Sequence, residues 1–302
     1  MELHQLRYFC AVARTGNFTR AAENQHIAQP SLSQQIHKLE DELGARLFDR
    51  LPRFARLTES GKAFLPRAEA ILRRVDEART EIQEQSRAAV GTVYVGSIPT
   101  IAPYFLPLVL ARFAGRYPGV SVRVIEDITS VLLDHLHHGR VDLVLLALPV
   151  RGEELQFEEL FRESLFACLP ESHRLASRKT IGLAEIRDEP FLLLKEGHCF
   201  RENALAACRR SRIDPNVIFE SGHFSTILAM VATGMGVSVV PAMAVSEHSG
   251  CRFVRLREDG MARRVGLVQL RHRYPTHAQR ALIEELRHHA RARNAVTSPV
   301  NR

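Results

Sequence analysis

The sequence contains no run of about 18 apolar residues, which is the length that a membrane-spanning helix needs. Its N-terminus also lacks the basic start and the continuous apolar segment of a secretory signal peptide. These two absences predict a chain without a membrane span and with a cytoplasmic location.

Cysteine is scarce and lacks the spacing of common metal sites. Five cysteines occur among 302 residues, and none of them forms a CxxC pair. An odd number in a reducing compartment argues against a structural disulfide framework, and the spacing gives no zinc site. Among the clustered histidines at 135, 137 and 138, only His135 and His138 share a helix face. We therefore expect no metal and no cofactor.

Signatures of nucleotide binding or catalysis are also missing. Gly234 and Gly236 lack the third glycine and the ribose-binding acid of a dinucleotide site, and no P-loop or Gly-x-Ser-x-Gly elbow occurs. We therefore do not expect an enzyme. What the chain does carry is a formal net charge of +7, which favours polyanionic partners.

The first 58 residues have the pattern of short helices. Apolar spacing predicts a helix that ends near Gly16, and Asn17 is suited to cap a second helix over residues 18–25. A third helix opens with Pro30 in its first turn, where proline is tolerated. One face of this helix is apolar, and another carries hydrogen-bonding side chains of medium length: Ser31, Gln34, Gln35 and Lys38.

That polar face has what a helix needs in the major groove, because Gln suits adenine and Lys suits guanine or phosphate. The loop-like stretch around Pro52 carries Arg46, Arg50, Arg53 and Arg56, which predicts a wing that contacts phosphates. An ordinary helical bundle with a polar outer face has the same pattern. The pattern alone therefore leaves both readings open.

A long helix is predicted over residues 59–88. Its apolar residues recur in steps of four and three, which is typical of a coiled-coil seam and predicts a dimer. A dimer presents two reading heads to two half-sites. Packing of the seam against its own domain is the alternative. The seam consists of Phe64, Ala68, Ile71, Val75, Ala78 and Ile82.

From residue 89 onward, strands and helices alternate. Nearly continuous apolar strands such as 141–148 predict a mainly parallel, covered sheet, and the length predicts two subdomains with a cleft. Ligands bind such sheets beyond the carboxyl ends of the strands, where Ser97, Thr100 and Thr129 are expected. The other predicted strands are 92–96, 120–125, 165–169, 191–194, 237–240 and 265–270, with helices over 104–116 and 131–138.

Several segments resemble the LysR-type transcriptional regulators: 18–22, 29–33 and 43–50 in the helix-turn-helix, Thr58 to Gly61 at the linker, and 234–237 in the effector domain. Ala28 departs from the family, which usually has Ser or Thr there. The resemblance implies double-stranded promoter DNA as partner, self-association into a dimer or tetramer, contact with RNA polymerase, and no membrane. It assigns DNA contacts to Thr19, Arg20, Gln29, Pro30, Ser31, Ser33, Gln34, Gln35, Lys38, Arg50 and Arg53.

The expected fold is an N-terminal all-α winged helix-turn-helix with a long linker helix, followed by a C-terminal α/β regulatory domain of two subdomains that resembles periplasmic binding proteins. The expected ranges are 1–58 for the DNA-binding domain, 59–88 for the linker and dimerisation helix, and 89–302 for the effector domain. Within the last, subdomain I takes about 89–163 and 268–302, and subdomain II about 164–267.

The segment from Glu196 to Arg201, with Cys208 nine residues after Cys199, resembles the hydrogen-peroxide sensors of the LysR family. Segments 98–100 and 263–268 and Thr129 match as well. The resemblance implies a regulator of the oxidative stress response in which Cys199 is the peroxide-reactive thiol and Cys208 the resolving thiol. It implies a peroxide pocket formed by Thr100, Thr129, His198 and Arg264.

This chemistry agrees with the local sequence. Residues 199–207 favour a helix that begins at Cys199, where backbone N–H groups and the helix dipole stabilise a thiolate, and Arg201 and Arg264 are expected to add positive charge. On one continuous helix, nine residues span about 13.5 Å and leave the thiols on opposite faces. A disulfide needs Cα atoms within about 7 Å, so its formation predicts local refolding. Cys10, Cys168 and Cys251 are expected to be structural.

Three other functions stay open at this point. The same scaffold suits a regulator that binds a small metabolite, commonly a carboxylate, in the cleft near Ser97, Thr100 and Thr129. A thiol peroxidase using Cys199 is a second, although the DNA-binding segment argues against it. A plain solute-binding protein is a third, but it needs export, and no signal segment is present.

Overall fold

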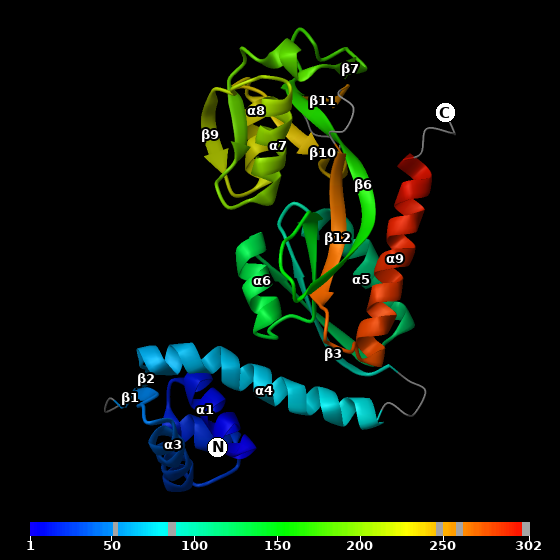
Figure 1. Ribbon diagram of the computed structural model, residues 1–302. Helices are drawn as coiled ribbons and strands as arrows, with labels where there is room; N and C mark the ends of the chain where they lie inside the picture. The colour runs from blue at the N-terminus through cyan, green and yellow to red at the C-terminus, as the bar shows by residue number, and fades with distance from the viewer. Residues whose placement is uncertain (51–53, 84–88, 246–249, 258–261, 298–302) are drawn as a thin grey trace. The chain divides into compact units, whose positions relative to one another are not determined.

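The computed structural model of the protein describes residues 1–50, 54–83, 89–245, 250–257 and 262–297 (Figure 1). The chain forms two compact units, one built on residues 1–87 and one built on the residues that follow. The first unit has one hydrophobic core and the second has two, so the second unit consists of two subdomains. Within the described ranges, no helix has the length and hydrophobicity that crossing a bilayer requires.

The first unit is built from helices α1 (Leu3–Thr15), α2 (Phe18–Asn24), α3 (Gln29–Leu43) and α4 (Glu59–Gln83). Gly16 ends α1 with a φ of +62°, a left-handed conformation that glycine adopts without strain. The Oδ1 atom of Asn17 then accepts hydrogen bonds from the backbone N–H groups of Thr19 and Arg20, at 2.8 and 3.1 Å. The predicted end of the first helix and the predicted cap of the second are confirmed.

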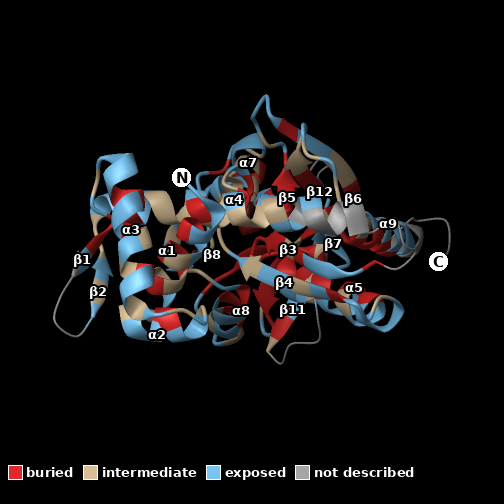
Figure 2. Ribbon diagram, turned by 90° about the horizontal axis from the view of Figure 1, so that it is seen from below, coloured by how far each residue is buried: buried red, intermediate tan, exposed pale blue. Residues whose placement is uncertain are grey.

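The third helix docks as its apolar spacing predicts. Leu32, Ile36 and Leu39 are fully buried in the core of the first unit, whereas Leu43 at the end of the helix is 40% exposed. Ala28 occupies the N-cap position and, having no side-chain oxygen, makes no capping hydrogen bond. Figure 2 shows the outer face of α3 as largely exposed, which leaves its polar residues accessible.

A two-stranded hairpin follows α3, so the first unit is not entirely helical. Strand β1 (Phe48–Arg50) pairs antiparallel with β2 (Ala55–Leu57). The buried Glu40 carboxylate of α3 accepts hydrogen bonds from the backbone N–H groups of Leu47 and Phe48, at 2.8 and 3.2 Å. This carboxylate fixes the start of the hairpin against the helix. Arg53 lies outside the described residues, as does the side chain of Arg50.

The linker helix α4 starts at a cap built on Thr58. Its hydroxyl donates to the carbonyl of Arg46 (2.7 Å) and accepts from the N–H of Gly61 (3.0 Å). The N–H of Thr58 donates to the carbonyl of Leu47 (3.0 Å). A Cβ atom at Gly61 would lie 2.1 Å from that same carbonyl oxygen. The close contact between helix and hairpin therefore requires glycine here.

Gly61→Ala is expected to destabilise the first unit by about 3 kcal/mol, because the new methyl group meets a backbone oxygen that is already held by a hydrogen bond. Gly115→Ala is the matched control: Gly115 is exposed in a helix with nothing within 4 Å of the added Cβ. It should be neutral or stabilise by up to about 1 kcal/mol. Calorimetric unfolding of both variants measures the difference, and equal transitions contradict the expectation.

The seam of α4 divides into two parts. Phe64 and the fully buried Ala68 pack in the core of the first unit, as the alternative reading of the seam expects. Ile71 is 36% exposed and Ala78 is exposed, so this part of the seam is accessible to another chain. The side chain of Ile82 lies outside the described residues. Packing of the seam against its own domain is thus confirmed for Phe64 and Ala68, whereas the dimer stays a prediction for the exposed part of the helix.

Subdomain I of the second unit is a sheet between helices. Strands β3, β4 and β5 are parallel, β12 pairs antiparallel with β5, and β6 pairs antiparallel with β12. Helices α5 and α9 cover one face and α6 the other (Figure 1). The bounds are β3 Gly91–Ser97, α5 Ala102–Arg116, β4 Val120–Glu126, α6 Thr129–His137, β5 Leu143–Leu148, β6 Leu155–Pro170, β12 Ala262–Leu270 and α9 His277–Thr297.

Two long strands connect the subdomains. The strand order is β4-β3-β5-β12-β6-β11-β7, where β11 is Cys251–Leu256 and β7 is Thr180–Ile181. Strand β10 (Ser238–Pro241) also pairs with β6, so β6 takes part in both cores. The prediction of a mainly parallel sheet is wrong, because every partner of β6 and both partners of β12 run antiparallel. The apolar runs predict correctly that the strands are buried on both faces, but they contain no information on the direction of the strands.

Subdomain II contains the segment with the paired cysteines. Its strands β8 and β9 are parallel, and α8 lies against β6, β8, β9 and β10. Strands β7, β9 and β11 were not predicted. The bounds are β7 Thr180–Ile181, η1 Leu183–Ile186, β8 Phe191–Leu194, α7 Cys199–Arg210, β9 Val217–Ser221, α8 Phe224–Ala232, β10 Ser238–Pro241, η2 Ala242–Ala244 and β11 Cys251–Leu256.

Candidate functional site

The candidate DNA-reading residues lie mainly on one exposed face of the first unit. Ser31, Gln34 and Lys38 are exposed and follow one another along α3 at steps of three and four. Pro30 is exposed at the start of that helix, and Thr19 and Arg20 are exposed at the start of α2. Gln29 and Ser33 are half-buried. Side chains of this length and polarity on an accessible helix can meet base edges and phosphates.

Gln35 has a different environment. Its Oε1 atom accepts a hydrogen bond from the side-chain amide of Gln5 in α1 (3.2 Å), and the ring of His4 lies at the same distance. Gln35 is also only half-exposed. These contacts commit its carbonyl oxygen to the packing of α3 on α1.

The five cysteines differ sharply in accessibility. Cys10, Cys168, Cys208 and Cys251 are buried, whereas Cys199 is half-buried. Burial raises the pKa of Cys10 to about 12 and raises the pKa of Cys168 and Cys251 above the ordinary range as well. These three groups therefore stay protonated at neutral pH, and a protonated thiol is a poor nucleophile.

Cys199 and Cys208 belong to one continuous helix, α7, and Cys199 is its first residue. The predicted helix N-terminus is confirmed. Cys199 packs against the core of subdomain I, whereas Cys208 is fully buried inside the core of subdomain II. Nine residues of α-helix separate the two Cα atoms by about 13.5 Å, so the thiols do not meet in this conformation.

The guanidinium of Arg201 points to a strand and not to the thiol. It donates to the carbonyl of Leu194 (3.0 Å) and to the carboxylate of Glu220 (2.5 Å). The expectation that Arg201 supplies positive charge for Cys199 is therefore not supported. The contribution of the helix N-terminus remains, because the first N–H groups of α7 have no partner within the helix.

His198 precedes the thiol and lies where the two subdomains meet. His198 is only 7% exposed, and the neighbouring Gly197 lies against Ile128 at the start of α6. Burial lowers the pKa of His198, and the charge of Lys195 lowers it further. At neutral pH the imidazole is therefore uncharged, with one nitrogen that accepts and one that donates a hydrogen bond.

Two buried hydroxyl groups lie after neighbouring strands and lack partners. Ser97 ends β3 and is fully buried, and Thr129 begins α6, just after β4. Among the described residues, neither Ser97 Oγ nor Thr129 Oγ1 has a hydrogen-bond partner. A buried hydroxyl without a partner is costly, so these groups are suited to hold a small polar molecule such as water or peroxide.

Thr100 is brought to a buried arginine, but the arginine is Arg263. Arg263 is 2% exposed, and its guanidinium donates to the Thr100 hydroxyl (2.6 Å) and to the Thr100 carbonyl (3.2 Å). The same guanidinium lies over the ring of Phe200, the residue after Cys199, at 5.3 Å from the ring centroid. Arg263 thus links subdomain I to the first turn of α7.

Arg264, the arginine that the sequence assigned to the pocket, lies elsewhere. Its guanidinium binds the carboxylate of Glu159 (2.6 Å), and its side chain is 39% exposed. Neighbouring residues of a strand face opposite sides, so β12 cannot direct both arginines into one site. Strand alternation carried the missing signal: Arg263 shares its face with the apolar, fully buried Val265 two residues later.

Glu163 completes the buried polar cluster. Its Oε1 lies 3.4 Å from Arg263 Nη1, and its Oε2 accepts the backbone N–H of Met243 (2.9 Å). Burial raises the pKa of Glu163, while the Arg263 charge opposes that rise. Because Glu163 lies on β6 and Arg263 on β12, this ion pair joins the two strands that run between the subdomains.

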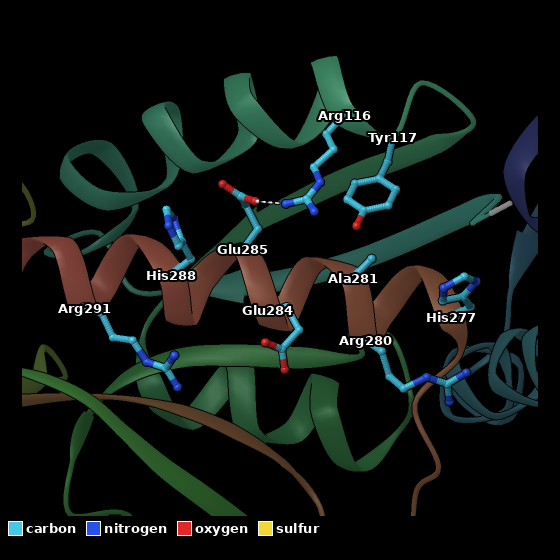
Figure 3. A pocket seen from close by; sticks show the side chains of 9 residues that line it. All are labelled: Arg116, Tyr117, His277, Arg280, Ala281, Glu284, Glu285, His288 and Arg291. Carbon is cyan, nitrogen blue, oxygen red and sulfur yellow. Dashed lines mark ion pairs between the residues drawn. The ribbon is translucent and has the colours of Figure 1, made fainter. Parts of the chain in front are cut away.

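A separate surface groove of about 550 Å³ lies on subdomain I, between the end of α5 and one face of α9 (Figure 3). Arg116 of α5 and Glu285 of α9 face each other across it with an N–O distance of 3.7 Å. None of the residues predicted to sense peroxide lines this groove. The groove and the thiol site are therefore different places.

Comparison with known proteins gives two family matches. Residues 3–62 match the model of the bacterial regulatory helix-turn-helix protein, lysR family, and residues 86–291 match the LysR substrate binding domain. The DNA-binding transcriptional dual regulator OxyR of Escherichia coli K12 is 33% identical over 271 residues, which is 89% of each chain.

Solved structures give the same result. Full-length OxyR from Pseudomonas aeruginosa superposes with a TM-score of 0.76 at 31% identity, covering 96% of this chain and 95% of that one. CbnR, a LysR regulator solved in complex with its target DNA, has a TM-score of 0.73 at 25% identity, covering 97% and 99%. The chain therefore belongs to the LysR family of DNA-binding transcriptional regulators, which are not enzymes.

Proposed function

We propose that this regulator senses hydrogen peroxide through Cys199 and stores the signal as a Cys199–Cys208 disulfide. The observation that carries the proposal is the selective accessibility of Cys199, which begins a helix while the other four cysteines are buried. Similarity of this chain to OxyR and to proteins named hydrogen peroxide-inducible genes activators supports it. Cys208, the proposed resolving thiol, belongs to the same helix.

The chemistry runs in two balanced steps. The Cys199 thiolate attacks one peroxide oxygen, the O–O bond breaks, and the leaving hydroxide takes a proton to become water, which leaves a sulfenic acid on Cys199. The Cys208 thiol then attacks that sulfur, the S–O bond breaks, and a second water leaves as the S–S bond forms. The two thiols together lose two electrons, which reduce one peroxide to two waters.

The second step requires α7 to unwind. Phe200, Ala204 and Ala207 are buried on the same helix, so unwinding disturbs the core of subdomain II and the Phe200–Arg263 contact. The free-energy cost of that disturbance opposes disulfide formation, so the disulfide is easier to reduce than one formed without such a cost. The proposal thus describes a reversible switch whose movement reaches β6 and β12.

Peptide mapping after treatment with one molar equivalent of peroxide tests the proposal. Free thiols are alkylated before digestion without reductant. We expect a peptide pair joined through Cys199 and Cys208, with Cys10, Cys168 and Cys251 alkylated only after denaturation. A protein in which Cys199 remains alkylatable after peroxide contradicts the proposal.

The output of the switch is proposed to be promoter DNA bound by α3 and by the wing, with a second copy of the chain binding through the exposed part of the α4 seam. The exposure of Ser31, Gln34 and Lys38 supports this, and the CbnR complex with DNA is a precedent within the family. Contact with RNA polymerase belongs to the same proposal, as does the placement of Arg50 and Arg53 at phosphates.

Gln34→Ala is expected to weaken binding to a DNA fragment selected from a random pool by the wild-type protein. The expected loss is about tenfold to a hundredfold, since a good side-chain–base contact contributes about 1–3 kcal/mol. Affinity for unselected DNA should change little, because phosphates supply nonspecific binding. Titration of both DNAs with the same variant checks this. An equal loss on both, or on neither, rules out base reading by Gln34.

The two unpartnered hydroxyls also favour a second candidate, a small metabolite bound in the cleft. Ser97 and Thr129 offer hydrogen bonds that an anion such as a carboxylate accepts. Isothermal calorimetry with a panel of small carboxylates distinguishes the two candidates. Binding that persists in Cys199→Ser, together with an unchanged DNA response in that variant, favours the metabolite.

A further inference from the structure

The side chain of Gln5 is oriented by the backbone at the start of α1. Its Oε1 atom accepts a hydrogen bond from the backbone N–H of Glu2 at 2.8 Å, in the arrangement of a capping box. A backbone N–H can only donate, so this bond fixes which end of the Gln5 amide is the oxygen. The Nε2 group is therefore the end that Gln5, a residue only 5% exposed, directs to α3.

The orientation of Gln5 in turn fixes that of Gln35 on α3. Gln5 Nε2 donates to Gln35 Oε1 (3.2 Å), so the end of the Gln35 amide that meets α1 is the acceptor. His4 Nε2 also lies 3.2 Å from that oxygen, and because a carbonyl oxygen only accepts, His4 donates here as the Nε2–H tautomer. A carbonyl oxygen has two lone pairs, so both acceptor positions of Gln35 are occupied.

The donor end of Gln35 is left for another partner. Among the described residues, the Gln35 side chain makes its hydrogen bonds through Oε1 alone, and the residue is partly exposed. Lys38 is exposed three residues further along α3 and is therefore its neighbour on the helix surface. The Lys38 ammonium also donates only. Two groups that can only donate thus lie next to each other on the helix proposed to meet the bases.

We propose that Gln35 reads guanine, because Gln5 and His4 leave it with hydrogen-bond donors only. This inference rests on the binding of DNA through α3 that is proposed above. Glutamine reads adenine by accepting from the N6 amine while it donates to N7, and an occupied Oε1 cannot take the first role. Guanine presents two acceptors, N7 and O6, on its major-groove edge, which suit the donors of Gln35 and of the neighbouring Lys38.

Gln5 is the positioning residue in this arrangement, since it is buried and acts through Gln35. Gln5→Glu reverses the polarity of the contact: one carboxylate oxygen still accepts from the Glu2 N–H, and the other now accepts from Gln35 Nε2. The Gln35 amide then turns over, and its oxygen faces outward, where it accepts from adenine N6 or cytosine N4. Gln5→Met removes the contact and leaves the Gln35 amide free to adopt either orientation.

Binding of the full-length wild-type protein to a selected DNA duplex and to its single-base variants gives the first test. The base that Gln35 reads is the position at which Gln35→Ala loses discrimination. We expect this base to be guanine, and adenine in its place should bind the wild type at least about tenfold more weakly. Inosine keeps N7 and O6 and should bind like guanine, whereas 7-deazaguanine lacks the N7 acceptor and should bind about threefold more weakly or worse.

The Gln5 variants give the second test, with Gln25→Glu as the control for charge. Gln5→Met should lose most of its discrimination at the Gln35 position and keep it elsewhere in the site. Gln5→Glu should prefer adenine or cytosine at that position. Gln25 lies at the end of α2, outside α3, and Gln25→Glu carries the same added charge but should keep the preference for guanine. A variant that circular dichroism shows to be unfolded is set aside, and the base analogues with the wild type then decide.

Three results overturn the inference. The first is a base other than guanine at the Gln35 position, the second is a Gln35→Ala variant that weakens every duplex equally, and the third is a folded Gln5→Met variant with the discrimination of the wild type or with an equal loss on all duplexes. Failure of DNA reading by α3 looks different, because then Gln34→Ala and Lys38→Ala also leave the preference of the protein among duplexes unchanged.

Discussion

Replacing Cys199 with serine is expected to abolish the response to peroxide. Cys208 is fully buried and the other thiols are buried as well, so the loss of Cys199 removes the accessible nucleophile. We expect oxidation of Cys208 by one equivalent of peroxide to slow by at least about a hundredfold, because attack then waits for local opening of the core. DNase footprints on a selected promoter fragment should be identical before and after peroxide.

Cys208→Ser separates the two steps of the proposed reaction. This variant should stop at the sulfenic acid on Cys199, which dimedone labels, and its footprint should remain that of the reduced protein. Cys168→Ala is the matched control, since Cys168 is an equally buried thiol in the same core. It should keep the full response if it folds. A peroxide-dependent footprint in Cys199→Ser would leave the thiol switch without support.

Replacing Arg263 with methionine is expected to have the largest effect on stability. Arg263 and Glu163 form an almost fully buried pair, with side chains 0% and 3% exposed. Removing the cation leaves the Glu163 carboxylate buried beside the Met243 N–H and without its ion-pair partner, which costs about 3–5 kcal/mol. It also removes the two hydrogen bonds to Thr100 and the contact with Phe200. Urea denaturation followed by circular dichroism measures the loss.

The pH dependence of that loss has a defined sign. Burial already raises the pKa of Glu163, and without Arg263 the pKa rises further. A carboxyl whose folded-state pKa is raised favours the folded protein at low pH and loses that contribution as the pH rises through the folded-state pKa. The defect of Arg263→Met should therefore be smaller at pH 5 than at pH 8.

Two comparisons control for the general effect of removing an arginine. Arg264→Met removes the neighbouring arginine, whose partly exposed pair with Glu159 contributes at most about 1 kcal/mol. The double variant Arg263→Met, Glu163→Met replaces the buried pair with apolar groups and should recover part of the loss. If Arg264→Met is as damaging as Arg263→Met, the assignment of the buried partner is wrong.

Much of the architecture follows from local sequence signals. Gly16 and Asn17 act through backbone conformation and side-chain hydrogen bonds over three residues, so the turn between α1 and α2 can be predicted from its own sequence. The apolar spacing of Leu32, Ile36 and Leu39 likewise identifies the docking face of α3. The helix that begins at Cys199 was predictable because residues 199–207 are good helix formers.

The features that the sequence did not reveal depend on partners far along the chain. The direction of β6 and β12 is set by pairing between residues about 100 positions apart, which apolar runs do not encode. Gln35 belongs to the polar pattern of α3, yet its contact with Gln5 is a property of how α3 meets α1. The sequence assigned Arg264 to the pocket, whereas the structure brings Arg263 to Thr100. Adjacent residues of a strand face opposite sides, so an error of one residue selects a side chain on the wrong face.

Hydrogen exchange of the α7 amides before and after one equivalent of peroxide tests most directly whether disulfide formation unwinds this helix. The amides from Asn203 to Arg210, which lie beyond the unpaired first turn, should be protected in the reduced wild type. They should exchange faster by at least about tenfold once the disulfide has formed, while Cys208→Ser shows no change after peroxide. Protection of α7 that is unchanged in a protein shown to carry the Cys199–Cys208 bond contradicts the account, because the two thiols would then have met without the helix opening.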